Sequence, residues 1–282
     1  MINFDILSIL PNRPIINIVD VGAMFIEEDP SPFAKLIEAG IAKIVGFEPV
    51  QAECDKLNSK AAQGSRYLPY AIGDGRKRTF HICNFPMTSS LYEPNTALLE
   101  KFNNLANVTR VVQRVEIQTH RLDDIIEVGD ADFLKLDVQG AELDILVGAT
   151  KVLDSAVLVE TEVEFVPMYK DQPLFAEMDQ HLRRHGFLFH KFPGLAGRTF
   201  KPLVVENDIN KMLSQTLWGD AVYARDFMFL DRLSPEKLLK LAVILHMQYQ
   251  SWDLAMESLK AYDAKTGAGL SGRYVQGLLS KG

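Results

Sequence analysis

Three residues that follow successive predicted strands have the types and order of an adenosine-binding pocket. Gly22 follows the first strand, Glu48 the second and Asp74 the third. A glycine lets backbone amides come close to a ligand. An acid after the second strand can accept two hydrogen bonds from a ribose diol, and the end of the third strand would lie beside the adenine. The sequence therefore predicts that the chain binds an adenosine compound.

The glycine pattern also bears on which adenosine compound binds. A dinucleotide pocket needs G-x-G-x-x-G to cradle a pyrophosphate, and this chain has Gly22 without the other two glycines. The successive acids Glu27, Glu28 and Asp29 would repel a pyrophosphate, whereas the sulfonium and ammonium cations of S-adenosylmethionine would tolerate them. We therefore expect S-adenosylmethionine as the cofactor, and an NAD-dependent sugar oxidoreductase is disfavoured.

Two more carboxylates, Asp137 and Glu142, lie where a predicted strand runs into a helix. The apolar residues of 133–138 indicate a buried strand, and the apolar spacing after Gly140 indicates a helix. Ligands of open α/β sheets sit at the carboxyl ends of the strands. Both carboxylates are therefore site candidates, although Glu142 at a helix N-terminus could also serve only to stabilise that helix.

A second set of acids alternates along the following strand. Glu160, Glu162 and Glu164 are spaced two apart, so their side chains share one face. They fit either a substrate site or a solvated sheet edge, and the sequence does not decide between the two. Lys135, on the preceding strand, is expected to pair with a carboxylate.

Six ordered motifs between about residues 15 and 190 resemble those of FkbM-type methyltransferases. They are Val19-Asp-Val-Gly-Ala23, Gly46-Phe-Glu-Pro49, Ala71-Ile-Gly-Asp74, Ser89-Ser-Leu91, Arg121-Leu-Asp-Asp124 and Phe133-Leu-Lys-Leu-Asp-Val-Gln-Gly-Ala-Glu142. The resemblance implies S-adenosylmethionine-dependent methyl transfer to a hydroxyl of a sugar, polysaccharide precursor or secondary metabolite. It also implies that Asp20, Gly22 and Ala23 hold the amino-acid end of the donor, Glu48 the ribose and Asp74 the adenine side.

Methyl transfer to a hydroxyl requires a group that removes the acceptor's proton. Asp137 and Glu142 are the candidate catalytic residues for this step. The chain departs from the family pattern at two places: Met24-Phe-Ile26 stands where the family usually continues Asn-x-Gly, and Gln139 stands where it usually has Glu.

These residues must be positioned by strands that alternate with helices, which predicts an α/β fold. We expect a Rossmann-like, seven-stranded doubly wound sheet of the class I methyltransferase type over residues 1–230. The predicted strands are 15–21, 43–47, 67–72, 133–137, 157–164, 187–190 and 221–230, with further strand-like runs between 79 and 120.

The remaining residues, 231–282, are predicted to form a C-terminal helical hairpin extension, with a third helix reaching Leu279. Ser234 and Pro235 mark a helix start. The apolar face that follows must be covered by the core or by a second copy of the chain, which would form a homo-oligomer. Because the donor motifs precede residue 140, we expect the tail to affect association more than donor binding.

Composition limits the partners. A net charge of −7 argues against nucleic acid, and no apolar run reaches the length of a membrane span. Cys54 and Cys83 form no disulfide framework, and the N-terminus lacks the features of a signal peptide, so we expect a cytoplasmic protein. No metal is expected, because His181 and His185 lack the glutamate of a zinc motif.

The alternative function is a non-catalytic adenosine-ligand-binding or scaffold protein.

Overall fold

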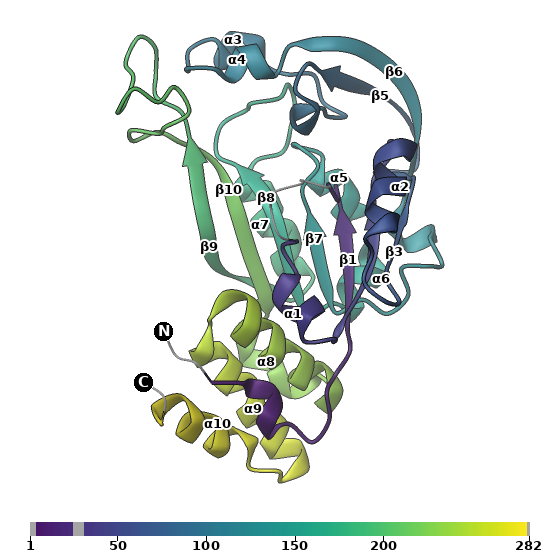
Figure 1. The fold of residues 1–282 in the computed structure, drawn as a ribbon, viewed down its shortest axis with the longest axis vertical. Helices are drawn as coiled ribbons and strands as arrows, with labels where there is room; N and C mark the ends of the chain where they lie inside the picture. Colours follow the sequence, from purple (N-terminus) through teal and green to yellow (C-terminus); the bar gives the residue numbers. More distant parts are fainter. Residues whose placement is uncertain (1–3, 25–30, 281–282) are drawn as a thin grey trace.

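The computed structural model describes residues 4–24 and 31–280, and its centre is a seven-stranded sheet (Figure 1). The strands lie in the order β3-β2-β1-β7-β8-β10-β9, and β10 runs antiparallel to both neighbours. Their bounds are β1 Ile16–Val21, β2 Ala42–Phe47, β3 Arg66–Leu68, β7 Phe133–Leu136, β8 Leu158–Glu164, β9 Phe187–Gly197 and β10 Thr216–Arg225. The predicted fold class and the seven-stranded doubly wound sheet are confirmed. Glu27, Glu28 and Asp29 lie outside the described residues.

Apolar residues point to both faces of the central strands because helices cover both faces. Leu134 of β7 packs in a cluster with residues of α5 (Glu142–Val147), α6 (Thr150–Ser155) and α7 (Phe175–Arg184). Phe133, its neighbour, points the other way, into a cluster with α1 (Ala34–Glu38) and the C-terminal helices. A further helix, α2 (Gln51–Ser59), follows β2 and lies beside β3 (Figure 1).

A second, three-stranded sheet lies beyond the carboxyl ends of the central strands (Figure 1). It consists of β4 (Ala71–Ile72), β5 (Lys77–Cys83) and β6 (Val111–His120), in the order β4-β6-β5. The short helices α3 (Thr96–Leu99) and α4 (Leu105–Val108) belong to the same upper part of the molecule. This part covers the edge of the main sheet where the predicted site residues lie.

Several predicted strand bounds differ from the structure. The predicted strand 67–72 is divided between the two sheets, because Pro69 has no amide hydrogen to continue a ladder. The predicted strand 187–190 is longer and forms β9. The predicted strand 221–230 begins at Thr216 and ends at Arg225, because the Asp226 carboxylate accepts a hydrogen bond from the Met228 amide and starts the 3₁₀ helix Phe227–Arg232. Shorter 3₁₀ helices span Ile6–Ile9, Pro86–Thr88 and Leu122–Asp124.

The C-terminal residues form the helical hairpin, α8 (Pro235–Tyr249) and α9 (Trp252–Thr266), and the third helix, α10 (Leu270–Leu279), that the sequence predicts. Their apolar residues share one hydrophobic cluster with β1, β2, β7 and β8. The apolar face of α8 is therefore covered within the chain itself, and it gives no reason to expect a second copy. The cluster also crosses the predicted boundary between residues 230 and 231, so the two parts share one hydrophobic core.

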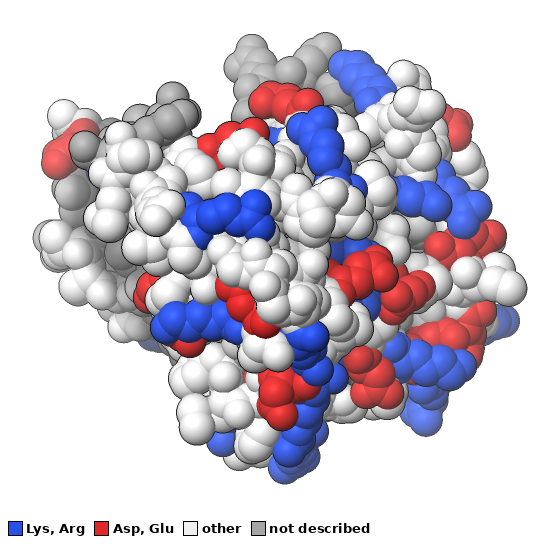
Figure 2. Space-filling model, turned by 90° about the horizontal axis from the view of Figure 1, so that it is seen from below, with Lys and Arg blue, Asp and Glu red and all other residues white. Residues whose placement is uncertain are grey.

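Viewed from the end where these helices lie, the surface carries Lys and Arg interspersed with Asp and Glu (Figure 2). Neither sign of charge forms an extended patch on this face. Within the two described ranges, every helix is too short or too polar to cross a membrane.

Candidate functional site

The site is built at the carboxyl ends of β1, β7 and β8, where the order of the strands reverses. β1 pairs with β2 on one side and with β7 on the other, and crevices at such switch points hold the ligands of doubly wound sheets. Asp20, Lys135 and Glu160 are direct neighbours in register across β1, β7 and β8. Two positions further along, Gly22 and Asp137 follow the ends of β1 and β7, where Gly22 lies against the Asp137 carbonyl and the Asp137 carboxylate lies close enough to Glu162 to influence it.

The turn after β7 is held by Glu142. Gln139 and Gly140 both have positive φ, and the turn brings the amides of Val138 and Gly140 to the Glu142 carboxylate, at 2.8 and 3.3 Å from Oε1. Glu142 is buried, and burial raises its pKa to about 7. Its contacts serve the turn and the start of α5, so the structure gives this predicted catalytic residue a clear structural task.

Asp137 has a different environment. Its carboxylate lies 3.4 Å from Lys135 Nζ and accepts a hydrogen bond of 3.2 Å from Gln139 Nε2, and 39% of its side chain is exposed. Burial acts to lower the pKa of Lys135, but the carboxylates of Asp137 and its neighbours outweigh burial and raise it. The predicted pairing of Lys135 with a carboxylate is therefore present. Asp137 is the better placed of the two candidate bases, because it is partly open and held by two donors.

Gln139, which stands where the family usually has Glu, makes hydrogen bonds to several residues at this edge of the sheet. Its Nε2 also donates to Glu162 at 2.7 Å, and its Oε1 accepts from the Tyr169 hydroxyl at 3.2 Å. Its backbone carbonyl accepts a 2.6 Å hydrogen bond from Ser90 Oγ. A single amide thus joins Asp137 to Glu162, a contact that a glutamate at this position could not donate.

The acids of β8 lie on one face, as their spacing predicts, but β8 is an inner strand between β7 and β10 rather than a sheet edge. Burial raises the pKa of Glu160, and raises those of Glu162 and Glu164 well above the usual range. The Tyr249 hydroxyl, at the end of α8, donates to Glu160. The C-terminal helices therefore reach the site, a contact that no motif or spacing in the sequence indicates.

The predicted donor residues are placed along β1 and β2. Asp20 is buried, and burial raises its pKa to about 6. Glu48 is also buried, with burial raising its pKa, and its Oε1 accepts a 2.7 Å hydrogen bond from the Val50 amide. The amides of Gly22 and Ala23 both donate to the Phe47 carbonyl, at 3.2 and 3.1 Å, so these amides already have a partner.

Asp74 lies further away, at the end of β4 in the small sheet. Its carboxylate accepts from the Arg76 amide at 3.0 Å and from Thr119 Oγ1 at 3.3 Å, and it pairs with Arg78 at 3.2 Å. Burial acts to raise the pKa of Asp74, but these hydrogen bonds and Arg78 lower it. Arg78, on β5, also pairs with Asp144 at 3.0 Å, so Arg78 joins the small sheet to α5.

We expect Gly22→Ala to destabilise the protein. Gly22 has a φ of +83°, and a Cβ there would lie 1.9 Å from the Asp137 carbonyl oxygen. Gly40→Ala is the matched control, because Gly40 also has a positive φ, +68°, but its Cβ would meet nothing within 4 Å. Both variants should lose about 1 kcal/mol of unfolding free energy from the backbone conformation, and Gly22→Ala about 1–3 kcal/mol more from overpacking. If denaturant unfolding shows the same loss of unfolding free energy for both variants, the close contact at Gly22 does not affect stability.

The buried carboxyl of Glu142 predicts a pH effect on stability. Its pKa is raised from 4.5 to about 7 in the folded protein, so the folded state holds this proton more tightly than the unfolded chain. The resulting stabilisation is complete below pH 4.5 and is lost as the pH rises through about 7. Glu142→Gln should therefore gain thermal stability relative to wild type across this range. The exposed Glu257→Gln is the control, and parallel melting profiles for Glu142→Gln and wild type would contradict the expectation.

The histidines form no recognisable metal centre. His181 and His185 lie side by side on α7, with ring centroids 4.7 Å apart. Across residues 4–24 and 31–280, no three His, Cys, Asp or Glu side chains are grouped so as to hold a metal ion.

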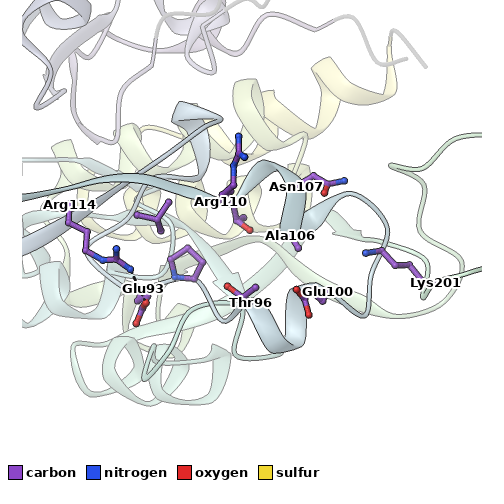
Figure 3. Close-up of a pocket in the computed structure, with 11 residues that line it drawn as sticks. Glu93, Thr96, Glu100, Ala106, Asn107, Arg110, Arg114 and Lys201 are labelled. Carbon is purple, nitrogen blue, oxygen red and sulfur yellow. Dashed lines mark hydrogen bonds and ion pairs between the residues drawn. The ribbon is translucent and has the colours of Figure 1, made fainter.

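A cavity of about 610 Å³ lies apart from this edge of the main sheet, between the segment around Glu93, helices α3 and α4, and β6 (Figure 3). Arg114 pairs with Glu93 there, at 3.1 Å, while Arg110 and Lys201 extend from other parts of the rim. The predicted catalytic and donor-binding residues are not among those that line it.

Comparison with known proteins gives a family match. Residues 20–189 match the methyltransferase FkbM domain family. No curated protein matches the chain. Among solved structures, a protein of Thermoplasma acidophilum assigned as a methyltransferase is 10% identical, with a TM-score of 0.36, over 76% of this chain and 69% of that one. The N-terminal domain of EvdMO1 with SAH bound is 9% identical, with a TM-score of 0.34, over 74% of each chain.

The family assignment rests on the domain match, which covers the strands and turns that carry Asp20, Glu48, Asp137 and Glu142. Because this match spans more than half of the chain, the protein belongs to the FkbM family of S-adenosylmethionine-dependent methyltransferases.

Proposed function

We propose that the protein transfers a methyl group from S-adenosylmethionine to a hydroxyl of a small-molecule or glycan acceptor, with Asp137 as the base. The observation that carries this proposal is the position of Asp137. It lies beside Gly22 at the switch point of the sheet, partly exposed and held by Lys135 and Gln139. A carboxylate fixed in this way can accept a proton from a hydroxyl that approaches it.

Glu48 and Asp20 are the residues proposed to hold the donor, which supplies the methyl group when it is bound. Both are buried carboxylates at the ends of β2 and β1, on the side of the switch point away from β8. Glu48 uses Oε1 for the Val50 amide, and its second oxygen can accept from a ribose hydroxyl. The Gly22 and Ala23 amides serve the Phe47 carbonyl, so we assign them a packing role beside the donor, with Asp74 at the adenine side.

The environment of Asp137 suits a base. Lys135 lies between Asp20 and Glu160 and offsets their negative charges. Without this lysine, repulsion from those two carboxylates would disfavour the ionised form of Asp137. Gln139 fixes the orientation of the carboxylate through one hydrogen bond and is itself fixed by Tyr169. As the acceptor oxygen formed its bond to the methyl carbon and the carbon–sulfur bond of the donor broke to release S-adenosylhomocysteine, Asp137 would accept the hydroxyl proton.

Glu48→Ala should weaken S-adenosylmethionine binding by about 1.5–3 kcal/mol, because the ribose loses a charged hydrogen-bond acceptor. Titration calorimetry measures this change. Glu53→Ala is a control on the following helix, where Glu53 pairs with Lys56 at the surface. Unchanged donor affinity in Glu48→Ala, with a normal melting transition, would remove Glu48 from the pocket.

Incubation of the purified protein with methyl-labelled S-adenosylmethionine and a panel of hydroxylated acceptors tests the function directly. Label transferred to an acceptor oxygen supports it. Donor binding without transfer to any acceptor would favour the alternative, a non-catalytic adenosine-ligand-binding or scaffold protein, and failure to bind the donor would overturn the proposal.

We further propose a cytoplasmic location, supported by two buried cysteines, Cys54 and Cys83, that form no disulfide. A homo-oligomer through the C-terminal helices stays a prediction from the sequence, and light scattering would test it.

A further inference from the structure

The acceptor side of the site is strongly acidic. Beyond Asp137, on the side away from Glu48, β8 contributes Glu160, Glu162 and Glu164, and β10 contributes Asp220, which is the register neighbour of Glu162. If the donor lies over β1 and β2, as proposed above, these carboxylates face the acceptor.

Two of these acids have hydrogen-bond partners, and a third, Asp220, is influenced by the charge of Lys135. Glu160 accepts from Tyr249, and Glu162 accepts from Gln139 at 2.7 Å. Burial raises the pKa of both Glu160 and Asp220, and the charge of Lys135 opposes that rise without cancelling it. The same lysine is also the close partner of Asp137, so one cation is shared among several carboxylates.

Glu164 differs from the other three. Its side chain is 2% exposed, and within the described part of the chain its Oε1 has no hydrogen-bond partner. Burial raises the pKa of Glu164 and the nearby side chain of Gln172, also buried, opposes that rise, although Gln172 Nε2 makes no hydrogen bond within the described part of the chain. The charged groups that act on Glu164 most strongly are the carboxylates of Glu142 and Asp137.

Arg198 is not among the groups that act most strongly on Glu164. Arg198 covers the ring of Trp218, the register neighbour of Glu164, with its guanidinium carbon 5.2 Å from the ring centroid. The carboxylate that acts on Arg198 is Asp208, on the loop between β9 and β10, rather than Glu164. Burial and the neighbouring carboxylates favour the protonated form of Glu164, and a ligand that supplies hydrogen-bond donors and a positive charge would favour its ionised form.

We propose that the acceptor carries an ammonium group close to the hydroxyl that is methylated, and that Glu164, with Glu162, receives it. An ammonium brings three N–H donors and a positive charge that every carboxylate of this face attracts. An acceptor with a phosphate or carboxylate at this position would be repelled. The acceptor is therefore an amino alcohol, of which an amino sugar is one form, and this inference rests on the proposed methyl transfer.

Calorimetry on the protein saturated with S-adenosylhomocysteine tests this inference. The probes are methyl 2-amino-2-deoxyglucoside, below the pKa of its amine, and its N-acetylated form, which differs by the loss of the charge. We expect the amine to bind about tenfold or more tightly than the amide, the change produced by a hydrogen bond to a charged group. Glu164→Gln should remove most of this preference, and Glu257→Gln, at an exposed site, should keep it.

If Glu164→Gln does not fold, as judged by its melting transition, Glu162→Gln takes its place. Equal or tighter binding of the amide, no binding of the amine, or a preference that survives in the folded site variant would overturn the inference. Each experiment begins with a titration of S-adenosylhomocysteine. This titration distinguishes failure of the proposed acceptor class from failure of the proposed methyl transfer. Nucleoside binding without an amine preference refutes only the acceptor class, whereas absence of nucleoside binding refutes the proposed function itself.

Discussion

Asp137→Asn is expected to lower turnover by about 10²–10⁴-fold, the usual consequence of losing a general base. The change keeps the size of the side chain and an oxygen that can accept the hydrogen bond from Gln139, so the turn after β7 should keep its shape. Donor affinity should be nearly unchanged, because the proposed donor contacts lie on β1 and β2. Single-turnover kinetics with bound donor separates the chemical step from binding.

Two further variants distinguish the loss of a base from the loss of one negative charge and from a loss of stability. Asp154→Asn, on the exposed surface of α6, controls for the loss of one negative charge and should leave turnover unchanged. Glu142→Gln should affect stability more than turnover, because the Glu142 carboxylate is bonded to the amides of the turn. Near-normal turnover in Asp137→Asn would leave Asp137 with a positional role and move the search for the base to Glu142 and the acids of β8.

The central strands were predictable because their apolar residues carry a clear pattern. Residues 15–21, 43–47 and 157–164 match β1, β2 and β8 closely. Predicted strands that contain a break were less accurate. Pro69 divides one of them between two sheets, and the strand-like runs after residue 79 form a sheet of their own, since strand pairing depends on contacts that local sequence does not specify.

The residues of the site likewise fall into two groups: those that the local sequence identifies, and those that enter the site through contacts between distant parts of the chain. Residue type and strand ends were enough to select Asp137, Glu142, Asp20 and Glu48, which the fold brings to one edge of the sheet. Their partners could not be selected in this way. Tyr249 meets Glu160 across 89 positions of sequence, and no spacing rule connects them. The role of Gln139 depends on a positive φ and on Glu162, which belongs to another strand.

Buried charges also connect the C-terminal helices to the sheet. Asp132, at the start of β7, is fully buried, and it pairs with Lys237 at 2.8 Å and with Lys240 at 3.0 Å, both from α8. The same carboxylate accepts a 2.8 Å hydrogen bond from the Asn17 amide at β1. Loss of one partner of a buried pair typically costs about 3–5 kcal/mol, because the other charge stays buried. The tail thus supports the two strands that form the switch point.

Removing residues 234–282 is therefore expected to abolish cooperative unfolding and, with it, donor binding. This differs from the expectation based on the sequence alone, in which the tail mattered chiefly for association. The truncation would expose Ile16, Ile18 and Phe133 in the cluster that α8 covers, and it would leave Asp132 without its two lysines. Thermal and denaturant unfolding, followed by calorimetry with S-adenosylhomocysteine, measure the two losses.

A matched pair of point variants tests the same dependence in the full-length chain. Leu241 in α8 is 0% exposed, and Leu279 at the end of α10 is 78% exposed. Leu241→Ala should lower the free energy of unfolding by about 2–5 kcal/mol, and Leu279→Ala should change it by about 0.5 kcal/mol or less. If the truncated protein still unfolds cooperatively and binds the nucleoside with wild-type affinity, the tail is a separate domain. In that case the shared cluster contributes little to the stability of the sheet, and the contact between Tyr249 and Glu160 is dispensable for the donor site.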